Sequence, residues 1–145
     1  MAISEQDLLL YTIDEGTNDN IKFFNFMKNL IKVIEERNIN NPLLIMDNCS
    51  IRLTKDLINF YKENKMKILT IVPYASELNA IEIFFNYIKQ KIYKKTFGSF
   101  KKLIEFVEKI LKEDELNKIV IQKIFKKTIT LYLKYIDNNN KLNLN

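Results

Sequence analysis

Two short apolar runs limit this chain's fold more than any other feature. Residues 43–46 (Leu-Leu-Ile-Met) and 67–72 show no polar alternation, which is typical of parallel strands covered on both faces. An amphipathic segment at 55–64 lies between them, with Thr54 placed to cap its start. Strand, helix and strand in this order predict a parallel βαβ unit with a right-handed crossover. The expected fold class is therefore α/β.

The rest of the chain is predicted to be mainly helical. Residues 2–13 suggest a hairpin, which Gly16 and the residues after it end. Apolar residues recur at helical spacing in four further segments, so we expect helices at about 19–37, 78–95, 100–112 and 115–136. We therefore expect one domain over residues 1–136 and a mobile, Asn-rich tail at 137–145.

The residue types present exclude several chemistries. The chain has 145 residues, no histidine and one cysteine, Cys49. These counts rule out an internal disulfide, a Ser-His-Asp triad and His-ligated zinc. Apolar runs fall short of the roughly 18 residues of a membrane span, and the N-terminus lacks a signal-peptide pattern. We expect an intracellular protein without membrane contact, nuclear if eukaryotic and otherwise cytoplasmic.

Two acidic residues stand where a parallel sheet would place a binding site. Asp47 ends the first apolar run, and ligands of such sheets gather at the carboxyl ends of strands. Glu82 lies in the first turns of the helix expected at 78–95. Together they could hold divalent metal for phosphoryl transfer. The alternatives are that Asp47 caps the following turn and that Glu82 is a solvated residue.

A basic cluster is a candidate contact for nucleic acid. Lys89, Lys91, Lys94 and Lys95 lie near the end of the same helix, and the net charge of the chain is +5. Lysines at such spacing can contact backbone phosphate without base specificity. An ordinary solvated helix face is an equal alternative.

The sequence around the two acids resembles a known family. Asp47-Asn48 with Arg52, the stretch from Pro73-Tyr74 to Glu82, and Phe85 with Lys89 are similar to the DDE domain of mariner-type transposases and related bacterial insertion-sequence transposases. The family patterns are Asp-Asn-x-x-x-His and Pro-Tyr-Ser-Pro-Glu-Leu-Asn-Pro-Ile-Glu. The resemblance extends over about residues 1–110. It implies an RNase H-like fold, a mixed sheet with flanking helices, here with extra C-terminal helices.

The resemblance also implies a reaction and a site. Members of the family cut and join DNA with three acids and two Mg²⁺ (or Mn²⁺) ions. Asp47 would be the second acid and Glu82 the third, both as metal ligands and catalytic residues. Asn48 and Asn79 would be supporting polar groups. Lys89 would be a phosphate contact.

Three departures from the family pattern qualify these expectations. Arg52 stands where the family has histidine, and Ala75, Ser76 and Ala80 replace the pattern's prolines and a serine. The family's first acid lies on a central opening strand upstream of everything matched here, and Asp14 is too close to Asp47 to replace it. We expect a truncated domain that is inactive alone, with a second polypeptide or a second copy supplying the missing strand. The alternative is a non-catalytic remnant or repurposed module that binds DNA or protein.

Overall fold

The computed structural model describes residues 1–17, 19–49, 52–71 and 78–142, with side chains described up to residue 134. The chain divides into two compact units. Unit 1 consists of Met1–Ala2 and Leu9–Ala75, and unit 2 of Ile3–Leu8 and Ser76–Asn145. Each unit is described by itself below.

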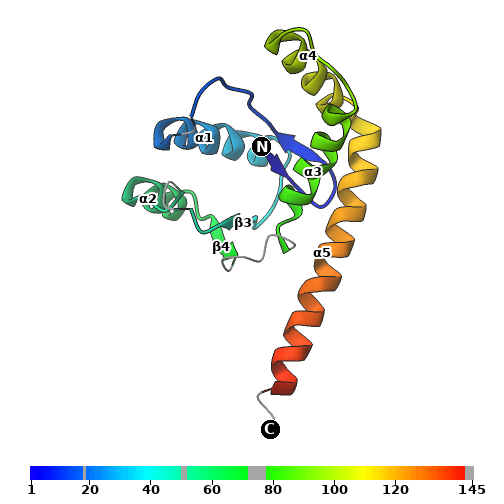
Figure 1. Ribbon diagram of the computed structural model, residues 1–145. Helices are drawn as coiled ribbons and strands as arrows, with labels where there is room; N and C mark the ends of the chain where they lie inside the picture. Colours follow the sequence, from blue (N-terminus) through cyan, green and yellow to red (C-terminus); the bar gives the residue numbers. More distant parts are fainter. Residues whose placement is uncertain (18, 50–51, 72–77, 143–145) are drawn as a thin grey trace. The chain divides into compact units, whose positions relative to one another are not determined.

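The described residues form a mixed α/β structure with five helices and four short strands (Figure 1). The elements in chain order are β1 (Ala2–Ile3), β2 (Leu8–Leu10), α1 (Asn20–Glu36), β3 (Leu43–Asp47), α2 (Lys55–Glu63), β4 (Lys67–Ile71), α3 (Ala80–Tyr93), α4 (Phe100–Leu111) and α5 (Asp114–Leu142).

The predicted βαβ unit is confirmed as β3–α2–β4. The two strands pair in parallel, from Leu43 opposite Lys67 to Asp47 opposite Ile71. Thr54 caps α2 as expected, because its hydroxyl accepts the backbone N–H of Leu57 at 3.4 Å. The strand expected to end at residue 72 is described to Ile71, and residues 72–77 lie outside the described part of the chain.

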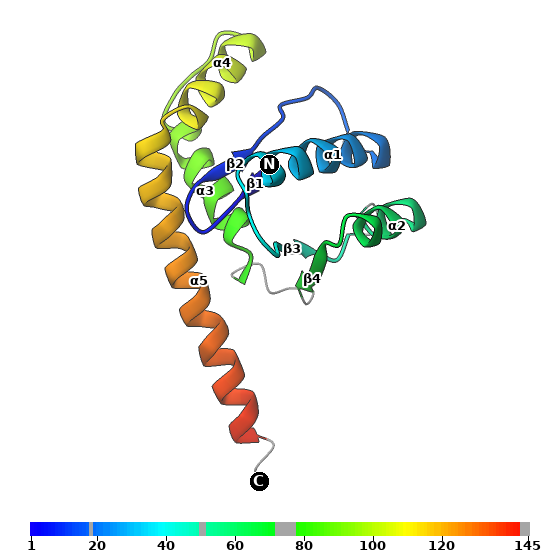
Figure 2. The same cartoon turned by 180° about the vertical axis from the view of Figure 1, so that it is seen from behind.

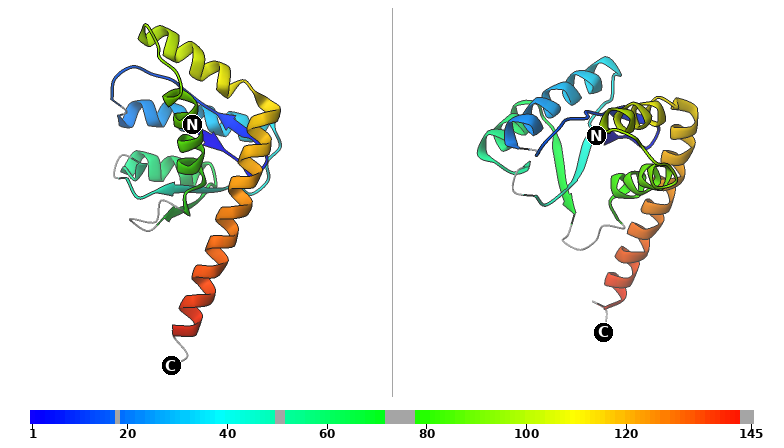
Figure 3. Two further views of the ribbon diagram at one scale, coloured as in Figure 1. Left: turned by 45° about the vertical axis from the view of Figure 1, so that its right-hand side comes forward. Right: turned by 45° about the horizontal axis from the view of Figure 1, so that its top comes forward.

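One face of the β3–β4 sheet forms the core of unit 1 with α1 and α2 (Figure 3). Its buried members are Met27, Leu30, Met46, Leu57 and Tyr61. The opposite face is different, since Leu43, Ile45 and Leu69 are 54%, 40% and 44% exposed. The expectation that both faces are covered is therefore wrong for these residues. An unbroken apolar run reports the side chains' hydrophobicity and not how many layers cover them.

The predicted N-terminal hairpin is present but short. β1 and β2 pair with each other across a turn in which the backbone N–H of Ser4 donates to the carbonyl of Asp7 at 2.8 Å. Gly16, which was expected to break the pattern, has a positive φ of 86°. Among the described residues the strands form two separate pairs, β1–β2 and β3–β4, with no strand that joins the two pairs. Strands of two and three residues offer few ladder hydrogen bonds to a further neighbour.

Unit 2 is built around α3 and the first half of α5, which lie side by side (Figure 2). Phe84 of α3 is fully buried, and Ile121 and Ile124 of α5 are buried with it. Asn117 of α5 is 1% exposed, and its amide donates to the carbonyls of Ile110 and Leu111 at 2.8 and 3.2 Å. Asn117 thus satisfies the last turn of α4, where carbonyls have no helical partner.

The last helix is longer than expected. We placed its end near residue 136, but α5 continues to Leu142, so the start of the Asn-rich segment is helical. Once a helix exists, each further residue adds a hydrogen bond without a new nucleation cost, which offsets the poor propensity of Asn. The domain boundary at 136 and the mobility of the tail stay predictions.

Within the described residues, no helix is both long and apolar enough to span a membrane.

Candidate active site

Asp47 ends β3, at the carboxyl edge of the parallel pair. Its backbone lies opposite Ile71, and its side chain is 47% exposed. Asn48 follows directly and is exposed. The apolar run buries Met46 and then delivers Asp47 and Asn48 to the edge of the sheet, as the sequence predicted.

Arg52 forms an ion pair with Asp47, in which guanidinium Nη1 contacts carboxylate Oδ1. The backbone of Arg52 is held on both sides. Its N–H donates to the carbonyl of Cys49 at 2.9 Å, and its own carbonyl accepts the hydroxyl of Tyr61 at 3.2 Å. The guanidinium carbon also lies 5.6 Å from the centre of the Phe23 ring. Sequence reasoning noted Arg52 only as a departure from the family pattern and missed this contact.

The positive charge of Arg52 also affects two other groups in unit 1. The pKa of the Met1 amine is lowered to about 6, first by burial and second by the charge of Arg52. Burial raises the pKa of Tyr61, and the charge of Arg52 opposes that rise. Arg52 thus acts on these two groups as well as on Asp47.

Glu82 lies in the first turn of α3, and its backbone N–H donates to the carbonyl of Asn79 at 3.0 Å. Asn79 occupies the N-cap position and is 8% exposed. Within the described residues, its side chain makes no capping hydrogen bond. The matched motif from Pro73 to Glu77, including Ser76, lies outside the described residues.

The two acids belong to different units, Asp47 to unit 1 and Glu82 to unit 2. Across the described residues, no group of three or more Asp, Glu or Cys side chains gathers in a metal-binding arrangement. The joint metal site that the sequence suggested therefore stays a prediction.

The four candidate lysines differ in their surroundings. Lys91 pairs with Glu113 at 2.9 Å and lies 4.8 Å from the centre of the Tyr87 ring. Burial lowers the pKa of Lys91, but its interactions with Tyr87 and Glu113 outweigh burial and raise it. Lys95 lies over the Phe106 ring at 4.3 Å, while its residue remains exposed. Lys89 and Lys94 are also exposed.

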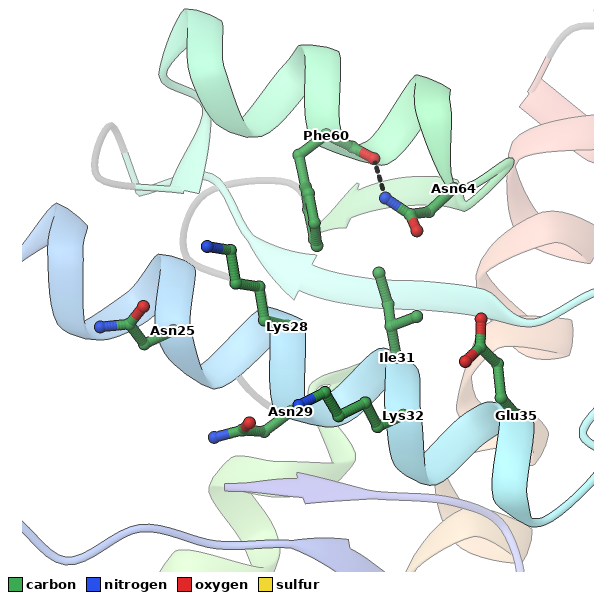
Figure 4. Close-up of a pocket in the computed structure, with 8 residues that line it drawn as sticks. All are labelled: Asn25, Lys28, Asn29, Ile31, Lys32, Glu35, Phe60 and Asn64. Atoms are coloured by element: carbon green, nitrogen blue, oxygen red, sulfur yellow. Dashed lines mark hydrogen bonds between the residues drawn. The ribbon is translucent and has the colours of Figure 1, made fainter.

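A polar groove of 440 Å³ in unit 1 was not expected from the sequence (Figure 4). Most of its lining comes from α1, and Phe60 of α2 and Asn64, the C-cap of α2, complete it. The Asn64 amide donates to the Phe60 carbonyl at 2.8 Å. The signal was present in the sequence, because Asn25, Lys28, Asn29 and Lys32 recur at helical spacing.

Comparison with solved structures identifies the class of fold. The Mos1 mariner transposase catalytic domain matches with a TM-score of 0.69 at 12% identity, over 86% of this chain and 66% of that one. Two structures of that domain with Raltegravir, one with Mn and one with Mg, match with the same TM-score at 12% and 13% identity, over 86% of this chain and 68% and 67% of theirs. The fold is that of a transposase catalytic domain, in agreement with the expected RNase H-like class.

The sequence itself matches a family. Residues 1–104 match the family described as DDE superfamily endonuclease, and the chain belongs to that family. The resemblance noted from the motifs is thereby confirmed. No curated protein matches the chain significantly.

Proposed function

We propose that this chain carries part of the active site of a DDE-type enzyme that cleaves and transfers DNA strands. The observation that supports this most directly is that the family match over residues 1–104 includes both Asp47 and Glu82. Asp47 ends a parallel strand and Glu82 opens a helix, which are positions suited to presenting carboxylates to a ligand. In this proposal both residues are catalytic metal ligands.

The donor atoms fit the expected metal. Carboxylate oxygens are hard ligands that suit Mg²⁺ and Mn²⁺, and neither histidine nor cysteine is needed. When bound, two such ions stabilise the attacking and leaving oxygens of an in-line displacement. One feature of Asp47 opposes the fit, since its Oδ1 already contacts the guanidinium of Arg52.

Polar and basic residues near the two acids have supporting roles in this proposal. Asn48 and Asn79 lie close to Asp47 and Glu82 in the chain and would orient groups beside them. Lys89 and Lys94 are the better DNA contacts, because both are exposed. Lys91 and Lys95 would serve DNA only in addition to their contacts with Glu113 and Phe106.

We infer that the chain is not a competent nuclease alone. The family chemistry uses three acids, and the resemblance assigns only Asp47 and Glu82. A second polypeptide or a second copy of the chain would contribute what is missing. Two features support a partner: the exposed apolar face at Leu43, Ile45 and Leu69, and the outer edges of β3 and β4, which pair with no other described strand.

A nicking assay on supercoiled DNA with Mg²⁺ or Mn²⁺ tests activity, beside calorimetric titration of Mn²⁺ into the protein. We expect Mn²⁺ binding that Asp47→Ala and Glu82→Ala both weaken, and no nicking by the chain alone. Asp56→Ala, which removes an exposed acid of α2, is the matched control and should bind Mn²⁺ normally. Nicking that Asp47→Ala abolishes would refute the proposed inactivity while supporting the assigned residues.

The second candidate function is a non-catalytic DNA- or protein-binding module. The ion pair of Asp47 with Arg52 favours it, because a carboxylate neutralised within the chain has no need of metal. This function predicts DNA binding, or capture of a protein partner, that is indifferent to Mn²⁺ and to Asp47→Ala. Metal binding that depends on Asp47 would contradict it.

A further inference from the structure

We propose that Arg52 is a resident counter-cation of Asp47 that competes with a divalent ion for Oδ1 of the carboxylate. This inference rests on the proposed function of Asp47 as a metal ligand. It assigns to Arg52 the role of a positioning residue that sets how tightly unit 1 binds metal. The same contact pairs the charge of the carboxylate within the chain.

The contact is placed to compete directly with metal. Nη1 of Arg52 contacts Oδ1 of Asp47, so a cation that binds this oxygen competes with the guanidinium for it. Arginine keeps its charge at every pH at which proteins fold, so proton loss cannot remove the competitor. A metal ion therefore gains this oxygen by exchange with the guanidinium.

The pair can open without unfolding its surroundings. The side chains of Arg52 and Asp47 are 32% and 47% exposed, so water can solvate both when they separate. The backbone of Arg52 is anchored independently of its guanidinium, through Cys49 and Tyr61. The Phe23 ring gives the released guanidinium a second surface within reach.

The charge near Asp47 also disfavours metal while Arg52 stays in place. Burial is the main cause of the lowered pKa of the Met1 amine, and the charge of Arg52 is the second cause, so Arg52 also acts on a group other than its ion-pair partner. A divalent cation at Asp47 would meet the same repulsion. Removal of the Arg52 charge should therefore tighten metal binding even though it destabilises the metal-free carboxylate.

The test is calorimetric titration of Mn²⁺ into the full chain and into Arg52→Gln. We expect about tenfold tighter Mn²⁺ binding in Arg52→Gln, the scale of one charge interaction in a partly solvated site. Lys55→Gln is the matched control, because it removes one exposed positive charge from α2 and should leave the affinity unchanged. Adding Asp47→Ala to Arg52→Gln should abolish the gain.

Two further variants separate charge from folding. Arg52→Lys keeps the charge and should bind Mn²⁺ close to wild type, whereas Arg52→Met keeps an apolar stem beside Phe23 and should bind like Arg52→Gln. Circular dichroism checks that each variant is folded. Asp47-dependent binding that is equal in all variants overturns the role of Arg52 and leaves the proposed function standing. If neither wild type nor any folded variant binds Mn²⁺ through Asp47, both proposals fail.

Discussion

Nη1 of Arg52 contacts Oδ1 of Asp47, the last residue of β3, which lies five positions earlier in the chain. The acid that the family resemblance marks as catalytic is thus paired within its own chain. Substitutions of these two residues therefore test both the proposed function and the energetic weight of the pair.

We predict that the pair contributes little to stability. Both side chains are partly exposed, and ion pairs of this kind give about 0–1 kcal/mol. Urea unfolding of Asp47→Asn, Arg52→Gln and the double variant yields the coupling free energy. A coupling energy of roughly 2 kcal/mol or more would mean that the pair is desolvated, and would contradict easy displacement of Arg52 by metal.

Stability should rise between pH 6 and pH 8 in a chain produced with Met1 as its first residue. The pKa of the Met1 amine is about 6 when folded and 8.0 ordinarily, so the unfolded chain binds more protons in this window. The gain is at most about 2–3 kcal/mol. The chain has no histidine, the side chain that ordinarily titrates here. Urea unfolding at several pH values measures the slope.

Acetylation of the Met1 amine is the control for this pH dependence. The acetylated chain has no charge at that nitrogen, so its stability should be flat across the same window. A slope that survives acetylation would assign the pH dependence to another group.

The four candidate lysines should differ in their effect on DNA affinity. Lys89→Gln and Lys94→Gln should each lower the salt dependence of binding by about 0.9 for every DNA phosphate that the variant no longer neutralises. Lys91→Gln and Lys95→Gln should change it less, because those side chains already contact Glu113 and Phe106. Binding titrations at several salt concentrations compare the pairs. Equal slopes for all four would mean that the internal contacts do not withhold Lys91 and Lys95 from DNA.

Asn117→Ala should destabilise unit 2 by roughly 1–3 kcal/mol, the cost of leaving buried hydrogen-bonding groups unpaired. Asn117 is 1% exposed and supports the carbonyls of Ile110 and Leu111. Lys118→Ala, at the next and less buried position, should cost under about 0.5 kcal/mol. Thermal unfolding of the two variants makes the comparison, and equal destabilisation would remove the special role of Asn117.

The sequence predicted the helices and strands of this fold well, but it predicted poorly which parts of the chain cover them. The β3–α2–β4 unit and the Thr54 cap followed from local patterns, because apolar runs and capping residues act within a few positions. The exposed face of β3–β4 did not follow from a local pattern, because the pattern shows which residues are apolar and not what covers them. The end of α5 was misplaced because an Asn-rich segment suggests a break, while a long helix can continue through it.

The candidate site shows the same division. Asp47 was correctly placed at the end of a strand, which a single run of residues determines. The pairing of Lys91 with Glu113 joins residues 22 positions apart and leaves no mark in either local pattern. Arg52 lies near Asp47 in the sequence, but its direction depends on a loop and on Phe23 and Tyr61.

Tyr61 carries a consequence of its own. Its ring is part of the core of unit 1, at 4% exposure, and its hydroxyl holds the carbonyl of Arg52 at 3.2 Å. One side chain thus connects the interior of the unit to the residue that neutralises Asp47. Heating or a mutation that loosens this core should therefore also loosen the ion pair of Arg52 with Asp47, so that pair reports on the integrity of the core of unit 1.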